Sequence, residues 1–294
     1  GFKVDLQYAN NEVATQVSQI ENMISAGVKV LVIAAIDGKT LTSVLASAKT
    51  AGIYVIAYDR LIMDTDAVSY YCTFDNYMVG TIQGQYIKDQ LKLDDGGKYN
   101  IEITAGDPAD NNALYFYKGA IDVLQPYIDS GVLTVVSKQV KFEEVATPAW
   151  STETSQARME AILASFYADG TQLDACLCSN DSTAKGVTNA LASSYTGKYP
   201  IVTGQDCDIV NTKDIIAGKQ AMSIFKDTRT LAAQTVAMVS DLLAGKTPQV
   251  NDTKSYDNGT GIIPTFLCAP VFADKSNYEE LLVKSGYYTA DQLK

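Results

Sequence analysis

The segment at residues 53–60 constrains the fold more than any other part of the sequence. An apolar run of strand length follows Gly52 and ends abruptly in a carboxylate, Asp59, and a guanidinium, Arg60. In an open parallel sheet, the side chains just past the carboxyl ends of the strands line the ligand crevice. We therefore predict that Asp59 and Arg60 lie in a ligand-binding crevice.

Other apolar runs along the chain end in the same way. Each run is followed by an acid or an amide at its carboxyl end, where an α/β fold binds its ligand. These side chains are Asp37, Asp75 with Asn76, Asp107, Asn180 with Asp181, and Asp206. Asp and Asn are also ordinary N-cap residues, so helix capping explains any one of these positions by itself. Their recurrence predicts a polar pocket, with capping as a second role.

Composition disfavours several classes of function. The 294 residues, 47% of them hydrophobic, can bury a full core and favour two domains. A net charge of −11 disfavours nucleic acid and anionic membranes as partners, because both need a basic surface. The absence of histidine removes Ser-His-Asp and Cys-His chemistry and the commonest metal ligand. An enzyme built on this sequence would need carboxylates, lysine or tyrosine.

Strand-like and helical patterns alternate along the whole chain. This alternation is typical of parallel sheets covered by helices. A glycine-rich loop at residues 94–97 divides the pattern into two series. We therefore predict an α/β fold of two similar lobes with a cleft between them.

Three local expectations follow from the same patterns. Alternating apolar residues predict a strand at residues 4–8. A helix that begins at Asn111 is expected to stop before Pro126. Pro264 and Pro270 interrupt the strand-like run at residues 262–271, which suits a sheet edge or a crossover better than a central strand.

Further polar side chains form a set that suits a neutral polyhydroxylated ligand. Two lie in the acid- and amide-rich loop at residues 107–112, one is the only tryptophan, and three end successive strands; they are Asp110, Asn112, Trp150, Asn180, Asp206 and Lys226. Carboxylates and amides satisfy hydroxyl groups both as donors and as acceptors. A tryptophan face covers the apolar side of a sugar ring. No nucleophile–base pair accompanies these groups.

Several of these side chains also have an interpretation without a ligand. Trp150 is alternatively a lid over the core, and Lys226 is alternatively solvated. For Arg60, the alternative is a surface ion pair with Asp59 or Asp64.

Six ordered motifs carry a resemblance to a known family. The segments AYDRLIMDTD, FDNYMVG, DPADNNA, LCSNDSTAKGV, TGQDCDIV and IFKD resemble the type I periplasmic sugar-binding proteins of ABC transporters. Within that family the chain is most similar to the ChvE-type multiple-sugar-binding and xylose-binding proteins. The resemblance covers essentially the whole chain.

The resemblance implies a fold, a ligand and a set of contact residues. It implies two Rossmann-like lobes with parallel sheets and a three-crossover hinge, which closes around an aldopentose or aldohexose. It also implies that the closed, ligand-loaded protein is presented to an ABC permease. It implies no catalytic residue, metal or cofactor. The family's pocket residues fall on Asp59, Arg60, Asp110, Asn112, Trp150, Asn180, Asp206 and Lys226.

The resemblance also implies lobe boundaries and a location. The N-terminal lobe is expected to comprise residues 1–98 plus 226–262, and the C-terminal lobe residues 99–225 plus 263–294. A first strand and helix of the family precede the point that corresponds to Gly1, so we expect this sequence to be a fragment of a longer protein. We expect a monomer in the periplasm or on the cell surface as a lipoprotein, with its signal sequence outside this chain.

Three other functions remain compatible with the same fold and residues. The effector domain of a LacI-type repressor needs a DNA-binding headpiece, and the net charge of −11 argues against it. A sugar-acting enzyme that uses paired carboxylates would reveal itself by product formation. A sensory ectodomain that reports sugar occupancy to a membrane kinase shares the binding chemistry, so only capture of its partner separates it.

Overall fold

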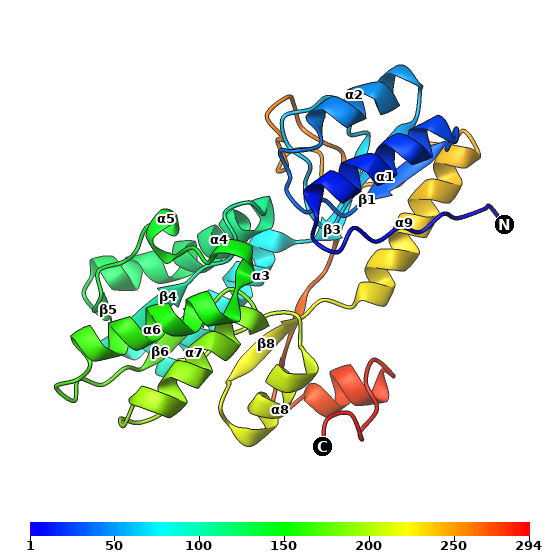
Figure 1. Ribbon diagram of the computed structural model, residues 1–294. Coiled ribbons are helices and arrows are strands. Elements are labelled where there is room, and N and C mark those ends of the chain that lie inside the picture. Colours follow the sequence, from blue (N-terminus) through cyan, green and yellow to red (C-terminus); the bar gives the residue numbers. More distant parts are fainter. The chain divides into compact units, whose positions relative to one another are not determined.

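The apolar run at residues 53–58 becomes a buried strand in a four-stranded parallel sheet. In the computed structural model, which describes residues 1–294, this sheet has the order β1 (Val30–Ile33), β2 (Tyr54–Tyr58), β3 (Tyr70–Phe74) and β9 (Thr265–Cys268). The helices around it are α1 (Val13–Ser25), α2 (Thr42–Thr50) and α9 (Thr228–Leu243) (Figure 1). Ile56 and Cys72 pack with Leu231 and Met238 of α9 in one hydrophobic cluster. As expected from Pro264, β9 is an edge strand.

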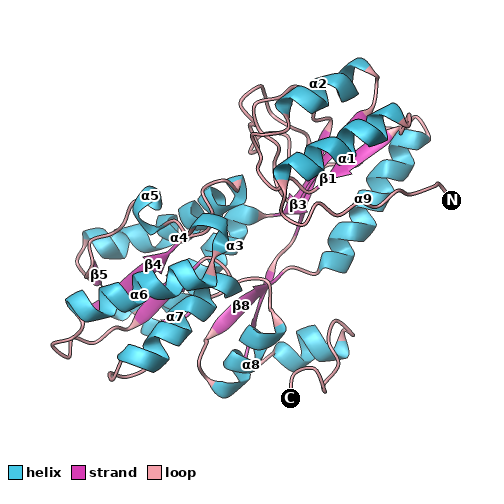
Figure 2. Cartoon of the chain, in the orientation of Figure 1, coloured by secondary structure: helices cyan, strands magenta, loops and turns pink.

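A second four-stranded parallel sheet lies further along the chain. Its order is β5 (Leu133–Val135), β4 (Tyr99–Thr104), β6 (Ala175–Cys178) and β7 (Ile201–Val202). The remaining strands, β8 (Met222–Phe225) and β10 (Val271–Asp274), form a separate antiparallel pair. Figure 2 distinguishes the helices from the strands by colour.

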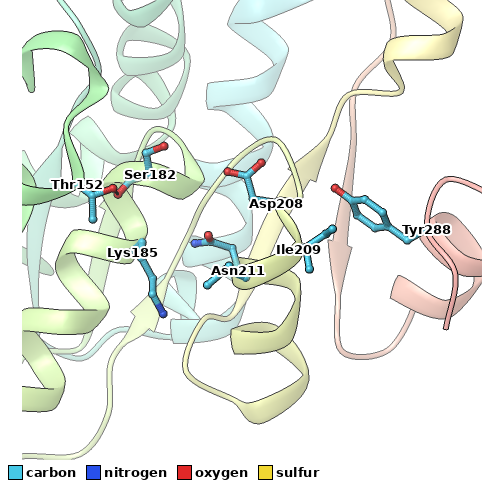
Figure 3. A pocket seen from close by; sticks show the side chains of 8 residues that line it. Thr152, Ser182, Lys185, Asp208, Ile209, Asn211 and Tyr288 are labelled. Atoms are coloured by element: carbon cyan, nitrogen blue, oxygen red, sulfur yellow. Dashed lines mark hydrogen bonds between the residues drawn. The ribbon is translucent and has the colours of Figure 1, made fainter. Parts of the chain in front are cut away.

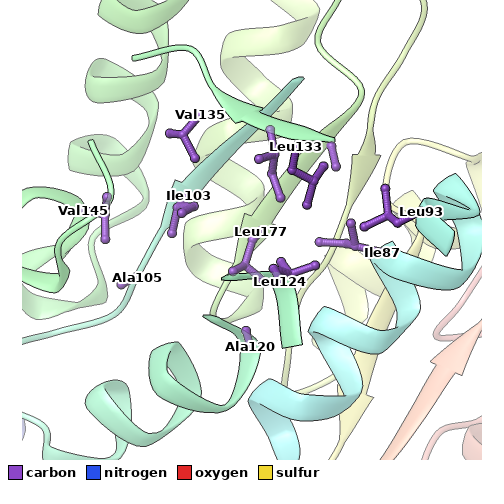
Figure 4. Packing of buried hydrophobic residues seen from close by; sticks show 12 residues of the cluster. Ile87, Leu93, Ile103, Ala105, Ala120, Leu124, Leu133, Val135, Val145 and Leu177 are labelled. Atoms are coloured by element: carbon purple, nitrogen blue, oxygen red, sulfur yellow. The ribbon is translucent and has the colours of Figure 1, made fainter. Parts of the chain in front are cut away.

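Helices surround this second sheet and the antiparallel pair. They are α3 (Asn76–Leu91), α4 (Asn111–Asp129), α5 (Phe142–Val145), α6 (Thr152–Phe166), α7 (Asp181–Ser194) and α8 (Ile209–Ala217), with short helical turns at Leu93–Asp95, Pro148–Trp150 and Glu279–Lys284. The core joins side chains of α3, α4 and the strands, among them Ile87, Leu124, Ile103, Leu133 and Leu177 (Figure 4). No helix of the structure is both long enough and apolar enough to cross a membrane.

The chain divides into two compact units. Unit 1 comprises Gly1–Phe74, Ala109–Asn111 and Thr228–Cys268, and unit 2 comprises Asp75–Pro108, Asn112–Asp227 and Ala269–Lys294. This division differs from the predicted lobes chiefly at residues 75–98, which lie in unit 2. The physical reason is the packing of α3, which contacts β6, β8 and β10 of that unit.

The strand predicted at residues 4–8 is wrong. Val4, Leu6 and Tyr8 are exposed, and the segment has no strand pairing. Gln19 Nε2 of α1 donates a hydrogen bond to the Tyr8 carbonyl, at 2.9 Å. An alternating pattern supplies a face, but a strand also needs a neighbour for its backbone groups. β1 pairs only with β2, and residues 4–8 do not pair with its free edge.

The predicted helix stop before Pro126 is also wrong. α4 continues to Asp129 with Pro126 inside it. Proline removes the hydrogen bond to the carbonyl four residues earlier, which belongs to Asp122. Both Asp122 and Pro126 are exposed, so water can satisfy that carbonyl.

Glycines allow α3 and α4 to approach closely. A Cβ added at Gly80 would overlap the carbonyl oxygen of Phe116, and one at Gly119 would overlap the carbonyl oxygen of Tyr77. At Gly84, an added Cβ would lie 2.8 Å from the carbonyl oxygen of Ala120. The two helix backbones are therefore in contact along this line, and a side chain at Gly80 would separate them.

Gly80→Ala is expected to lower the free energy of unfolding by about 1–3 kcal/mol because of this contact. An exposed helical glycine changed to alanine ordinarily gains about 0.5–1 kcal/mol, so the sign of the change is informative. Urea denaturation measures it, with Gln85→Ala on the exposed side of α3 as the control. A Gly80→Ala protein as stable as wild type would contradict the close packing.

Candidate ligand-binding site

Asp59 and Arg60 follow β2 directly, as the sequence predicts. The backbone of Asp59 is left-handed, with φ of 62°. Three hydrogen bonds hold it there: its N–H donates to the Cys72 carbonyl at 2.9 Å, and its own carbonyl accepts from Tyr71 Oη at 2.6 Å and Thr73 Oγ1 at 2.8 Å. A non-glycine residue held in this conformation by its surroundings is typical of functional sites.

Arg60 forms an ion pair with another predicted site residue of unit 1. Its Nε lies 3.0 Å from Asp110 Oδ2, and the Asp110 side chain is only 5% exposed. Arg60 Nη1 also donates to the Ile36 carbonyl at 3.0 Å. The ion-pair partner of Arg60 in unit 1 is thus Asp110, where the alternative interpretation named Asp59 or Asp64.

Asp206 and Lys226 form a matching ion pair in unit 2. Lys226 Nζ lies 3.2 Å from Asp206 Oδ1, and it also sits 5.6 Å from the centre of the Phe116 ring. Asp206 is left-handed, with φ of 98°, and its N–H donates to the Ile224 carbonyl at 2.8 Å. The Lys226 side chain is 11% exposed, so this lysine is not the solvated one of the alternative interpretation.

Trp150 lies at the end of the turn Pro148–Trp150 in unit 2 and is half-buried. Ala149 and Trp150 are both left-handed, with φ of 56° and 54°, and the Trp150 N–H donates to the Thr147 carbonyl at 3.1 Å. The indole packs against a core cluster that contains Phe116. The indole therefore packs on the core, and the residue stays partly exposed to solvent, where a ligand can reach it.

The two predicted amides have different surroundings within unit 2. Asn180 caps α7: its Oδ1 accepts the Thr183 N–H at 3.0 Å. Its Nδ2 group makes no hydrogen bond in the structure and can donate to a ligand, so capping and binding are compatible. Asn112 is buried, and its Oδ1 accepts from Asn76 Nδ2 at 2.9 Å.

A buried acid, Asp181, fixes the loop that carries Asp206. Its carboxylate is fully buried and accepts hydrogen bonds from Gln220 Nε2, from Ser223 Oγ and from the Asp208 N–H, all at 2.8 Å. Burial raises the pKa of Asp181 well above its usual value, and the nearby Asp206 carboxylate raises it further. These bonds tie the start of α7 to the loop two residues after Asp206.

Unit 2 also contains a polar hollow of about 430 Å³. The starts of α6, α7 and α8 line it together with the C-terminal segment, through Thr152, Ser182, Lys185, Asp208, Ile209, Val210, Asn211 and Tyr288 (Figure 3). Lys185 Nζ is paired with Asp214 Oδ2 at 2.7 Å. None of the eight predicted ligand residues lines this hollow. No group of three or more acids and cysteines is placed to hold a metal ion.

The structure thus gathers the predicted residues into two sets. Unit 1 holds Asp59, Arg60 and Asp110, and unit 2 holds Asn112, Trp150, Asn180, Asp206 and Lys226. Within each set the basic side chain is paired with a carboxylate of the same set. The sequence did not single out Phe116 or Gly106, whose contacts with Trp150 only the folded chain reveals.

Comparison with known proteins identifies the family. The model of the periplasmic binding protein domain matches residues 1–247. The chain belongs to this family, and the predicted fold class, α/β with parallel sheets in two lobes, is confirmed.

Several relatives are similar over the whole chain. The multiple sugar-binding periplasmic receptor ChvE of Rhizobium radiobacter is 52% identical over 299 residues, which cover 100% of this chain and 84% of the receptor. The D-xylose-binding periplasmic protein of Escherichia coli is 36% identical over 293 residues, with coverages of 100% and 84%. These relatives are binding and receptor proteins.

One solved structure is similar in both sequence and fold. It is an ABC transporter solute-binding protein from Clostridium phytofermentans with bound β-D-glucose. Its TM-score is 0.97 and its identity 68%, over 100% of this chain and 91% of that chain.

Proposed function

We propose that the protein is an extracytoplasmic solute-binding protein that captures a monosaccharide and delivers it to an ABC permease. The observation that carries this proposal is the 68% identity, over the whole chain, with a solute-binding protein that holds β-D-glucose. The ligand is an aldopentose or aldohexose such as glucose, xylose, galactose or arabinose. The protein binds its ligand by hinge closure and does not transform it.

The proposed ligand contacts are the eight residues predicted from the sequence. Their local geometry supports the role, because Asp59, Trp150 and Asp206 all sit in left-handed backbone conformations that their neighbours maintain. Held in this way, a polar side chain keeps a fixed direction and loses little freedom when the ligand arrives.

The charges of these residues favour a neutral ligand. Arg60 is paired with Asp110, and Lys226 with Asp206, so each cation already has a carboxylate partner. Hydroxyl groups can add hydrogen bonds to such pairs without changing their charge balance. A ligand carboxylate would instead add a negative charge to pairs whose charges already balance, and this repulsion disfavours it.

Titration of the single tryptophan tests the proposal. We expect saturable changes in Trp150 emission with D-glucose or D-xylose, and none with the open-chain alcohol D-sorbitol. D-Glucuronate at neutral pH should bind at least about tenfold more weakly than D-glucose because of its charge. If none of the four aldoses changes the emission, and calorimetry of the same samples shows no heat of binding, the protein is not an aldose receptor.

A further inference from the structure

The indole of Trp150 occupies the place where a side chain at Gly106 would stand. A Cβ built on Gly106 would overlap the Cη2, Cζ3 and Cζ2 atoms of the indole, which all belong to its six-membered ring. The φ of Gly106 lies outside the left-handed region, so its backbone would accept any residue. The glycine is therefore required by the tryptophan ring and by nothing in its own conformation.

Backbone hydrogen bonds tie the loop that carries Trp150 to the segment that contains Gly106. The Ala105 N–H donates to the Val145 carbonyl at 2.8 Å, and the Thr147 N–H donates to the Gly106 carbonyl at 3.0 Å. The end of β4 and the turn before α6 thus form one rigid piece. The distance between the Gly106 backbone and the indole is fixed by these bonds and cannot relax easily.

Phe116 supports the indole from α4. Its ring centre lies 6.3 Å from that of Trp150, with the two planes tilted by 54°, and Phe116 is only 2% exposed. The same Phe116 ring lies 5.6 Å from Lys226 Nζ, which is the partner of Asp206. One buried ring therefore contacts two of the proposed ligand residues, which come from distant parts of the sequence.

We propose that Gly106 and Phe116 are positioning residues: together they form a seat that fixes the indole of Trp150 for stacking on the ligand. Phe116 also fixes the ammonium group of Lys226, so the stacking surface and the Lys226–Asp206 pair keep a constant spacing. The role of the seat in binding rests on the proposed function, whereas its effect on the indole is a property of the ligand-free protein. The two are measured separately.

The first test changes Gly106 and leaves every proposed ligand residue unmutated. In ligand-free Gly106→Ala, we expect Trp150 to be displaced, with stronger acrylamide quenching, a longer emission wavelength and a weaker near-ultraviolet circular dichroism band. The Kd for the aldose should rise by about tenfold, the cost of a misplaced aromatic contact. Gly197→Ala is the matched control, because it places a methyl group against the Tyr195 ring in an exposed loop of the same unit.

A double-mutant cycle separates positioning from a general structural effect. Trp150→Phe replaces the indole by a smaller phenyl ring, which lacks the distal Cη2, Cζ3 and Cζ2 atoms that the added methyl group would strike. Gly106→Ala should therefore lower aldose affinity about tenfold in the wild-type background. In the Trp150→Phe background the same change should lower it less than about twofold, as measured by calorimetry. An equal cost in both backgrounds would show that the methyl group acts elsewhere and would overturn the proposal.

Phe116→Leu provides the second test should Gly106→Ala fail to fold. It keeps an apolar core side chain, and it is expected to raise both the acrylamide quenching of Trp150 and the Kd for the aldose. Phe142→Leu, which disturbs the Phe142–Tyr117 pair instead, should change neither. If Trp150 is quenched as in wild type in folded Gly106→Ala or Phe116→Leu, these residues do not position the indole. If quenching increases and the aldose affinity is unchanged, the position of the indole plays no part in binding. If the wild-type protein binds no aldose, the proposed function is wrong. The quenching measurement on the ligand-free variants still decides whether Gly106 and Phe116 position the indole.

Discussion

Replacing Asp206 by asparagine is expected to weaken aldose binding by about 100-fold and to leave the fold intact. The change removes a charged acceptor for ligand hydroxyl groups and the ion-pair partner of Lys226, which lies 3.2 Å away. Asparagine is the right replacement because it tolerates the left-handed backbone, with φ of 98°, that position 206 requires. Calorimetric titration with D-glucose and D-xylose measures the loss.

Asp208→Asn is the matched control for this prediction. Asp208 lies in the same loop, two residues after Asp206, and it lines the separate polar hollow of unit 2. Burial raises the pKa of Asp208, so neutralising it relieves a cost and removes no proposed ligand contact. Equal losses of affinity in the two variants would mean that the loop, and not the Asp206 carboxylate, sets the affinity.

Arg60→Met is expected to lower the stability of the protein by about 2–4 kcal/mol and to abolish aldose binding. The stability loss arises because the Asp110 carboxylate, 5% exposed, would lose its ion pair with Arg60 at 3.0 Å. We expect a smaller loss of stability than for a fully buried ion pair because the Arg60 side chain is itself 30% exposed. Urea denaturation gives the stability, and calorimetry the binding.

Two companion variants show whether the Arg60–Asp110 pair is responsible. Arg60→Met combined with Asp110→Asn should recover part of the lost stability, because the second change removes the buried charge that had lost its pair with Arg60. Lys49→Met breaks the exposed Lys49–Asp66 pair, whose side chains are 52% and 71% exposed, and should cost less than about 1 kcal/mol. If Arg60→Met is no more damaging than Lys49→Met, the pair does not stabilise unit 1.

The fold could be predicted well because the apolar runs are strong and local signals. The runs at residues 53–58 and 173–178 form strands β2 and β6, and the side chains after them begin loops or cap helices, as Asn180 does. The family and the fold class are confirmed, whereas the eight ligand residues remain a prediction. What the structure adds for them is their local pairing, Arg60 with Asp110 and Lys226 with Asp206.

The errors arise where the outcome depends on distant parts of the chain. The apolar alternation at residues 4–8 carries no information on whether a neighbouring strand exists, and none pairs with it here. Pro126 is tolerated inside α4 because Asp122 and Pro126 are both exposed, so that water can satisfy the Asp122 carbonyl, and the sequence around Pro126 does not reveal this exposure. The contacts of Trp150 with Gly106 and Phe116 join three separate elements, so no local pattern indicates them.

Calorimetric titration of the wild-type protein with D-glucose, followed by recovery of the sugar, tests the central claim most directly. The account predicts one saturable site with a Kd in the micromolar range or tighter, about −8 kcal/mol or more favourable, and recovery of D-glucose chemically unchanged. D-Xylose, D-galactose and L-arabinose should then be ranked against it by competition. An absence of binding to all four sugars, or conversion of a bound sugar into a product, would contradict the assignment of this chain as an aldose-binding receptor.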